Sequence, residues 1–166
     1  MNGMRAGLIL GAMLGLASGA APAQVPVTAA ADPSALLKSA DPRLAHNKQL
    51  VYDFWREILQ AHHVELGPRY MLESYIQHNP NFPTGRDGIL NALSHAPVLP
   101  IQPTIVRPLV NIVAEGDLVV LSWVDARPNY TTTSFDMFRI QDGKIAEHWD
   151  TAALNPPRPP VPSSTQ

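Results

Sequence analysis

The sequence predicts an α+β protein in which helices come first and a curved antiparallel sheet follows. Three observations support this fold class. Apolar residues recur at three- and four-residue spacings over residues 51–62, and β-branched residues become frequent from about residue 101 onward. Asp142-Gly143 is typical of a tight hairpin turn. We therefore expect one folded domain, residues 41–154, with a cone-shaped sheet packed on N-terminal helices.

The two ends of the 166-residue chain differ in composition from its centre. Residues 1–23 contain Arg5, an apolar run and a small-residue end, which is the pattern of a cleavable signal peptide. The apolar run is short and glycine-rich, so we expect no stable membrane insertion after cleavage and a periplasmic or secreted protein. Residues 24–40 are predicted to be a disordered tether, and residues 155–166 a proline-rich disordered tail.

Capping residues and spacing predict the helices. Asp41-Pro42 is suited to the N-cap and first turn of a long amphipathic helix. Gly67-Pro68 interrupts its pattern, and we predict a short second helix over residues 68–73. Thr84 is a candidate N-cap for a third helix over residues 85–94.

The rest of the folded region predicts an antiparallel meander. Short turns at residues 115–117 and 141–144 separate runs of β-branched and aromatic residues. Because such turns join neighbouring antiparallel strands, consecutive strands are expected to pair. The predicted strands cover residues 105–106, 109–113, 118–124, 131–140 and 145–152.

Composition excludes several classes of function. The chain has no cysteine, which rules out thiolate catalysis, cysteine metal ligands and disulfide bonds. The formal net charge is −2 and no basic patch is visible, so we expect no nucleic-acid partner. No metal-binding histidine motif, phosphate loop or dinucleotide fingerprint occurs, so neither a metal site nor a cofactor is predicted.

The last predicted hairpin carries polar residues on one face of the sheet. Strand alternation places His148 and Asp150 on one face of the final strand. Asp136 lies in an apolar strand, where a charge should be exposed, paired or shifted in its pKa. Asp136 therefore either forms an ion pair with Arg139 or Arg127, or it has a functional role. That role would be a general base or a residue that orients His148.

The other candidates also have structural alternatives. His148 fits a structural histidine on a sheet face, and Asp150 fits a strand-end cap or an ion pair. His78 lies in the stretch YIQHNP, residues 75–80, and could belong to a polar turn or to a site wall. Together with Asp136, these residues would supply the carboxylate and two imidazoles that proton transfer requires. Trp55 and Trp123 are expected either in the core or on the wall of a cavity.

Three stretches resemble the SnoaL-like polyketide cyclase family within the nuclear transport factor 2-like superfamily. They are YIQHNP, the helix start Gly85-Arg86-Asp87-Gly88, and residues 135–150, FDMFRIQDGKIAEHWD. The resemblance spans essentially the whole folded region. It implies a curved sheet wrapped over helices, a pocket in the mouth of the cone, and a homodimer formed through the outer face of the sheet.

The resemblance also implies a reaction. Family cyclases close rings by intramolecular aldol condensation, in which a carboxylate removes a proton next to a carbonyl without a metal or cofactor. Motif position implies Asp136 as base and His148 as its partner, although His148 and Asp150 stay open as alternative bases. The remaining implied substrate contacts are Tyr75, His78 and Asn79, and we add Asp150, Trp55 and Trp123 as candidates.

We therefore expect an exported, cofactor-free acid–base enzyme of the aldol cyclase, isomerase or lyase type. Its expected substrate is a small hydrophobic carbonyl compound. A non-catalytic periplasmic small-molecule-binding protein and a dimerisation scaffold are the alternatives. A closed apolar pocket with polar groups would favour an enzyme or a binding protein, whereas a pocket filled by its own side chains would favour a scaffold.

Overall fold

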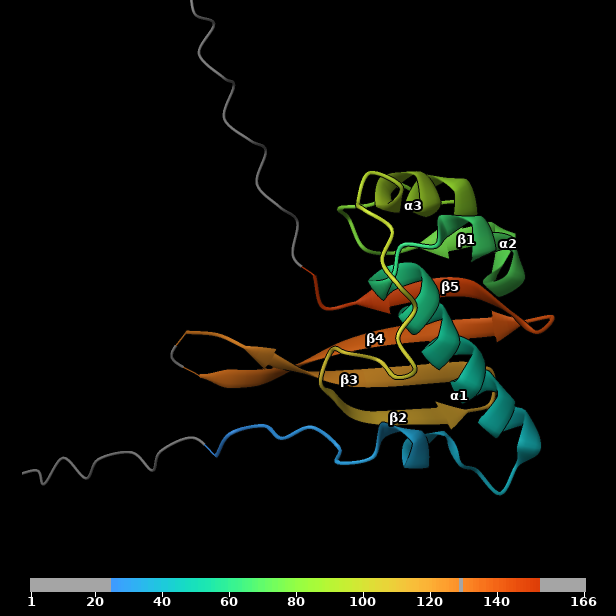
Figure 1. The fold of residues 1–166 in the computed structure, drawn as a ribbon. Coiled ribbons are helices and arrows are strands. Elements are labelled where there is room, and N and C mark those ends of the chain that lie inside the picture. Colours follow the sequence, from blue (N-terminus) through green and yellow to red (C-terminus); the bar gives the residue numbers. More distant parts are fainter. Residues whose placement is uncertain (1–24, 129, 153–166) are drawn as a thin grey trace, which may run out of the picture.

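The structure is a computed structural model that describes residues 25–128 and 130–152 (Figure 1). The predicted signal peptide, residues 1–23, and the predicted tail, residues 155–166, lie outside the described residues. Within the described residues, no helix is both long enough and apolar enough to cross a bilayer. The elements are a 3-10 helix Pro33–Leu37, α1 Pro42–Phe54, a π-helix Trp55–Gln60, a 3-10 turn Val64–Leu66, α2 Gly67–Tyr70, β1 Met71–Gln77, α3 Arg86–Leu93, β2 Leu109–Glu115, β3 Leu118–Ala126, β4 Thr131–Gln141 and β5 Lys144–Asp150.

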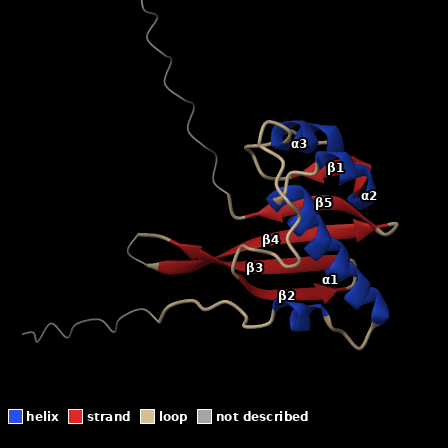
Figure 2. Ribbon diagram, in the orientation of Figure 1, coloured by secondary structure: helices blue, strands red, loops and turns tan. Residues whose placement is uncertain are grey.

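The five strands form one sheet in the order β1-β5-β4-β3-β2. Strands β2 to β5 pair as the antiparallel meander that the sequence predicts. Register shifts interrupt the β1–β5, β2–β3 and β4–β5 pairs, and irregularities of this kind bend strands. The helices cover one face of this curved, open sheet, with α1 crossing β2 and β3 (Figure 2). The predicted α+β class is confirmed.

The β4–β5 turn follows the sequence closely. Asp142 has φ 51° and Gly143 has φ 70°, the left-handed pair that a two-residue type I′ turn requires. Aspartate tolerates this conformation and glycine adopts it without steric cost. The turn sets the pairing of Gln141 with Lys144 and of Ile140 with Ile145, and a register shift between Arg139 and Ile140 then places Asp136 opposite Asp150.

The segment after Gly67 differs from the prediction. Helix α2 ends at Tyr70, and Met71–Gln77 form strand β1 instead of continuing a helix to residue 73. Strand β1 pairs in parallel with β5, far away in the sequence, so the sheet is mixed rather than wholly antiparallel. Met71 and Tyr75 are buried, and this burial stabilises the strand.

The predicted cap of the third helix is also wrong. Gly85, with φ 89°, is the residue before α3, and no side chain caps this helix. The Thr84 hydroxyl instead accepts a hydrogen bond from the backbone nitrogen of Gln77 at 3.2 Å. The backbone nitrogen of Gly85 donates to the Tyr75 carbonyl at 2.8 Å, so this loop is fastened to β1.

Residues 25–40, expected to be a disordered tether, have defined structure along the β2 edge of the sheet (Figure 1). The Ala30 nitrogen donates to the Leu109 carbonyl at 2.8 Å, and Lys48 Nζ donates to the Leu36 carbonyl at 3.0 Å. Leu36 and Leu37 pack against the core. These two leucines give the segment apolar area to bury, which the rest of its composition does not provide.

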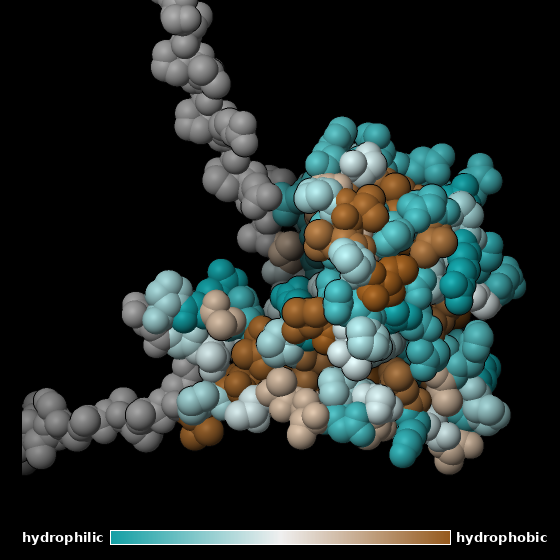
Figure 3. Space-filling model, in the orientation of Figure 1, coloured by the Kyte–Doolittle hydropathy of each residue, from teal (hydrophilic) through white to brown (hydrophobic). Residues whose placement is uncertain are grey.

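The strand predicted at residues 105–106 is a loop. The Ile105 nitrogen donates to the Tyr52 hydroxyl at 3.1 Å and the Val106 nitrogen to Gln60 Oε1 at 2.8 Å, so these backbone groups bond to side chains from the helical layer. Figure 3 shows apolar surface gathered over the segment between α3 and β2. The exposed apolar residues of that segment are Val98, Leu99, Ile101 and Val106.

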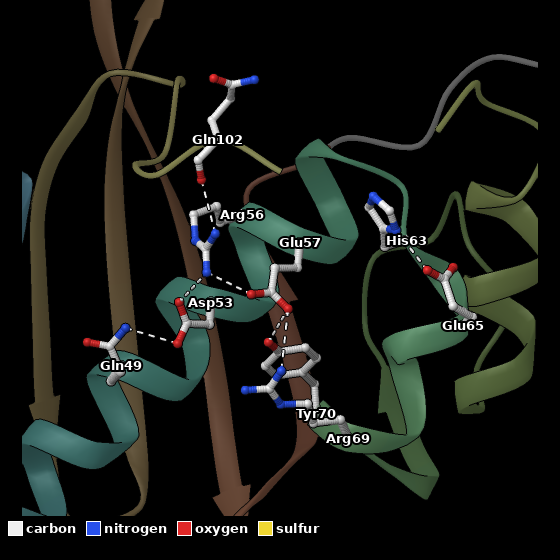
Figure 4. A network of polar contacts seen from close by, with 9 residues as sticks. All are labelled: Gln49, Asp53, Arg56, Glu57, His63, Glu65, Arg69, Tyr70 and Gln102. Carbon is white, nitrogen blue, oxygen red and sulfur yellow. Dashed lines mark hydrogen bonds and ion pairs between the residues drawn. The ribbon is translucent and has the colours of Figure 1, made fainter. Parts of the chain in front are cut away.

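A buried carboxylate links the π-helix to α2. Glu57, in the π-helix, is only 7% exposed. It accepts hydrogen bonds from the Tyr70 hydroxyl at 2.5 Å and from Arg56 Nη2 at 2.7 Å, and Arg69 lies at 3.8 Å (Figure 4). Burial and the hydrogen bond to Glu57 raise the pKa of the Tyr70 phenol, which therefore stays protonated as the donor.

This contact supports a prediction about stability. Tyr70→Phe should lower the free energy of unfolding by about 1–3 kcal/mol, because it removes a hydrogen bond from a buried carboxylate. Urea unfolding measures the change, and Tyr130→Phe is the matched control at a tyrosine that is 55% exposed. Equal effects of both substitutions would contradict the assigned role of Tyr70.

Candidate active site

A cavity of about 280 Å³ lies between the helices and the inner face of the sheet. The helices and their loops contribute mostly apolar side chains, and β1, β4 and β5 contribute most of the polar ones. The cavity is therefore not filled by its own side chains. Its lining residues are Phe54, Trp55, Leu59, Tyr75, Gln77, Asn79, Phe82, Ile89, Leu93, Arg107, Asp136, Phe138, His148 and Asp150.

Strands β4 and β5 bring three predicted site residues together. Asp136 is opposite Asp150 in the β4–β5 ladder, and Phe138 is opposite His148. All four line the cavity, so the predicted face of each strand is confirmed. One potential ligand atom from each of Asp136, His148 and Asp150 lies within 4.8 Å of the others, a geometry that could also hold a metal ion.

Asp136 has two polar neighbours. Trp123 Nε1 donates to Asp136 Oδ2, and His148 Nε2 lies 3.4 Å from Asp136 Oδ1. The alternative ion pairs are absent among the described residues, because Arg139 pairs with Asp117 and Glu147 while Arg127 pairs with Asp125. Trp123 is fully buried and does not line the cavity, so it supports Asp136 rather than contacting a ligand directly.

The tautomer of His148 follows from its neighbours. The backbone nitrogen of Asn79 can only donate, and it lies 2.9 Å from Gln77 Oε1, which fixes that atom as the amide oxygen. His148 Nδ1 lies 2.8 Å from the same oxygen and must therefore carry a proton. Consequently Nε2 is the ring atom left to exchange a proton with Asp136.

Asp150 has a different environment. Its Oδ2 accepts from Asn79 Nδ2 at 2.6 Å and its Oδ1 accepts from the Ala152 backbone nitrogen at 2.9 Å. Asn79 is itself 7% exposed, and its Oδ1 accepts from the Asn81 backbone nitrogen at 2.9 Å. Both oxygens of Asp150 are thus engaged by donors that cannot take up a proton.

Tyr75 supplies a hydroxyl to the cavity. It is 2% exposed, and its oxygen accepts a hydrogen bond from Gln77 Nε2 at 3.0 Å. Burial raises the pKa of the Tyr75 phenol, and the negative charges of Asp150 and Asp136 raise it further. The phenol therefore stays protonated, and no described residue accepts its proton by hydrogen bond, so the O–H is available to a ligand.

His78 does not join this site, contrary to the prediction. Its ring stacks on Trp149 with centroids 4.9 Å apart, and its Nε2 lies 2.7 Å from Glu147 Oε1. Both partners belong to the outer face of the sheet. The backbone around residue 78 is extended, so Gln77 and Asn79 face the cavity while the residue between them faces away.

The outer-face contact makes stability depend on pH. The hydrogen bond from His78, followed by that from Arg139, lowers the pKa of Glu147 from its ordinary value of 4.5. A lowered folded-state pKa contributes stability above 4.5 that is lost as the pH falls through the folded value. The destabilisation caused by Glu147→Gln should therefore shrink as unfolding is measured at successively lower pH below about 4.5. The exposed Glu73→Gln is the control, and a difference that grows on acidification would contradict this.

Two polar lining residues, Gln77 and Arg107, were not predicted from the sequence. Gln77 orients His148 and contacts Tyr75, and alternation along residues 75–79 would have identified it had this stretch been interpreted as a strand. Arg107 lies in a loop directly before Pro108, where no local sequence pattern indicates a site. Its position beside Trp55 and Trp123 arises only from tertiary packing.

The fold and site define a small α+β protein whose cavity, between the helices and the sheet, holds a carboxylate–imidazole pair. The model of the SnoaL-like domain matches residues 51–148, and the chain belongs to this family. The match includes Asp136 and His148 and ends two residues before Asp150. The curved sheet and helical cover are those of the nuclear transport factor 2-like fold.

Solved structures with similar folds are more distant. An NTF2-like protein of Mesorhizobium loti is 20% identical, with 68% of this chain and 94% of that chain covered and a TM-score of 0.48. An LEH-like epoxide hydrolase of M. tuberculosis is 17% identical, with 66% and 84% covered and a TM-score of 0.49. TsrD from Streptomyces laurentii is 20% identical, with 64% and 87% covered and a TM-score of 0.43. Comparison with curated proteins gave no match.

Proposed function

We propose that the chain is a cofactor-free acid–base enzyme that moves a proton in a small hydrophobic carbonyl compound. One observation carries the proposal: His148 Nε2 faces Asp136 Oδ1 at 3.4 Å inside a largely apolar cavity. A carboxylate in such a site can take up a proton, and the imidazole beside it can exchange that proton. Family membership supports the same reading.

The proposed reaction begins at carbon. The Asp136 carboxylate removes a proton from the carbon next to the substrate carbonyl. The electron pair of that C–H bond becomes the new C=C bond, and the π pair of the C=O bond moves onto the oxygen to give the enolate. The Tyr75 O–H donates a hydrogen bond to the resulting enolate oxygen, which lowers the barrier. In the aldol case the enolate α-carbon attacks a second carbonyl, and the new alkoxide takes the proton back from Asp136. In the isomerase case Asp136 returns the proton to a different carbon, and in the lyase case the enolate expels a leaving group from the β-carbon.

Asp136 suits the role of base better than Asp150. Both Asp150 oxygens accept hydrogen bonds from an amide side chain and a backbone nitrogen, which hold the carboxylate without exchanging protons with it. Asp136 instead faces His148, whose Nε2 can receive and return the proton. In this proposal Asn79 and Asp150 shape the polar wall of the cavity.

Proton exchange with solvent deuterium tests the function without knowledge of the natural substrate. Small aryl ketones, such as acetophenone and 1-tetralone, are incubated in D₂O with the protein, and NMR follows loss of the α-proton signals. We expect exchange above the buffer rate, unchanged by a chelator. Binding without exchange across the panel would instead support the alternative, a non-catalytic small-molecule-binding protein, which the same cavity also favours.

Two further expectations belong to this proposal. We propose that the protein is exported to the periplasm, supported by the composition of residues 1–23, and that it forms a homodimer. Phe135, which is 46% exposed, Met137 and Trp149 form an apolar patch on the outer face of the sheet that would suit such an interface. Cell fractionation and light scattering test the two expectations separately.

A further inference from the structure

Arg107 brings a positive charge to the cavity. Its guanidinium carbon lies 5.4 Å from the Trp55 ring centroid and 5.3 Å from that of Trp123. Nη2 donates to Ser134 Oγ at 3.0 Å. The two indole rings and the serine hold the side chain in place beside the cavity that it lines.

This charge has no carboxylate partner. Among the described residues, no carboxylate oxygen lies within the 4.0 Å ion-pair distance of Arg107. By contrast, Arg127 pairs with Asp125 at 2.5 Å, and Arg139 pairs with Glu147 at 2.9 Å. A guanidinium has five N–H donors, and Ser134 is the acceptor of one of them, so most of the binding capacity of Arg107 remains available.

A second unsatisfied donor lies beside it. Trp55 is 9% exposed and lines the cavity, and its indole Nε1 has no hydrogen-bond partner. It is the only buried side-chain nitrogen or oxygen without a partner in the described part of the chain. Buried donors normally have acceptors, so a ligand oxygen is a natural partner for this N–H.

We infer that the substrate carries a carboxylate, or a group of the same shape and charge, that binds Arg107 beside the Trp55 indole. This inference rests on the proposed function and narrows its substrate class to carbonyl compounds with an anionic group. The planar guanidinium suits a carboxylate because it can donate two parallel hydrogen bonds. Arg107 also lines a second cavity of about 270 Å³ that shares Asp136 and Asp150 with the first, which leaves space around it for such a group.

The nearby acids do not prevent this binding. Arg107 contacts Ser134, which precedes Asp136 by two residues on β4 and is therefore about 7 Å away along the strand. The carboxylates of Asp136 and Asp150 accept hydrogen bonds from Trp123 and Asn79, respectively, and these donors offset part of their negative charge. An anion at Arg107 thus leaves the carbonyl end of the same molecule free to reach Asp136 and Tyr75.

Calorimetry with a matched pair of probes tests the inference. The probes are 3-benzoylpropanoate and 3-benzoylpropanamide. They have the same carbon skeleton, and the first carries a carboxylate where the second carries an uncharged amide. We expect the acid to bind the wild type at least about tenfold more tightly than the amide, because the hydrogen bonds to it are charge-assisted. Arg107→Gln should bring the two affinities to within about twofold by removing that charge.

Two variants sharpen the test. Arg127→Gln removes a neighbouring arginine that is already paired with Asp125, and it should keep the preference for the acid. Trp55→Phe keeps a benzene ring and removes the indole N–H, and it should weaken binding of the acid several-fold, while urea unfolding measures separately the stability lost with the buried ring volume. Failure of the acid to bind, equal affinities in the wild type, or an unchanged preference in Arg107→Gln would overturn the inference.

The proposed function can fail separately. Asp136→Asn should keep the preference for the acid while losing deuterium exchange. If the wild type prefers the acid but exchanges no α-protons, the enzyme proposal is wrong and the protein is an anion-binding protein. If the wild type exchanges the α-protons of neutral ketones but shows no preference for the acid, the inference of an anion site is wrong and the enzyme proposal stands.

Discussion

Asp136→Asn is expected to slow α-proton exchange by about 10²–10⁴-fold, because an amide cannot act as the general base. The amide oxygen can still accept the hydrogen bond from Trp123 Nε1, so the side chain should keep its place against β3. Exchange is measured by NMR in D₂O with the aryl ketone that wild type exchanges fastest. Ligand affinity and urea unfolding are measured in parallel to separate catalysis from folding.

The neighbouring carboxylates serve as comparisons for Asp136. Asp150→Asn should have a smaller effect on exchange, because we assign Asp150 to the wall of the cavity rather than to proton transfer. Asp87, whose side chain is 87% exposed at the start of α3, provides a surface control. Full exchange activity in Asp136→Asn, or a larger loss of activity in Asp150→Asn than in Asp136→Asn, would show that Asp136 is not the base.

Phe138→Ala is expected to lower the free energy of unfolding by about 3–5 kcal/mol, because it leaves a large void in the core. Phe138 is 1% exposed and its ring meets Phe54 edge-on at 5.8 Å between centroids. Its ring centroid also lies 4.7 Å from that of His148. The substitution should therefore reduce exchange activity as well, by loosening the imidazole that faces Asp136.

Phe135→Ala is the matched control for this substitution. Phe135 lies on the same strand, but it is 46% exposed on the opposite face of the sheet. Its replacement should cost less than about 1 kcal/mol in a monomer, because little buried area is lost. Urea unfolding at low protein concentration compares the two variants, and similar losses would show that the assignment of the two faces is wrong.

Much of the site was predictable because it depends on local rules. Asp142-Gly143 specifies a two-residue turn, and that turn joins β4 and β5 as neighbouring antiparallel strands. Strand alternation places His148 and Asp150 on one face of β5, but Asp136 faces them only because the pairing shifts by one residue between Arg139 and Ile140. A hairpin is short-range in sequence, so its strand pairing can be inferred from residues that lie close together, whereas this shift carries no clear sequence signal.

The remainder depends on contacts between distant segments. The sequence predicts a helix over residues 68–73 and misses β1, because the strand that pairs with β1, β5, lies at the other end of the domain. That error also misplaced His78, since in an extended segment it must face away from Gln77 and Asn79. The role of Arg107 could not be inferred either, because the indoles against which it packs come from separate elements.

The parallel pairing of β1 with β5 has a consequence for the order of folding. Tyr75, Gln77 and Asn79 come from the first half of the domain, whereas His148 and Asp150 belong to its final strand. The hydrogen bonds from His148 to Gln77 and from Asn79 to Asp150 can therefore form only after β5 has been synthesised. Such contacts across a long sequence separation carry a large loop-closure cost and form slowly. A nascent or truncated chain that lacks β5 lacks His148 and Asp150, and it therefore cannot complete the polar wall of the cavity.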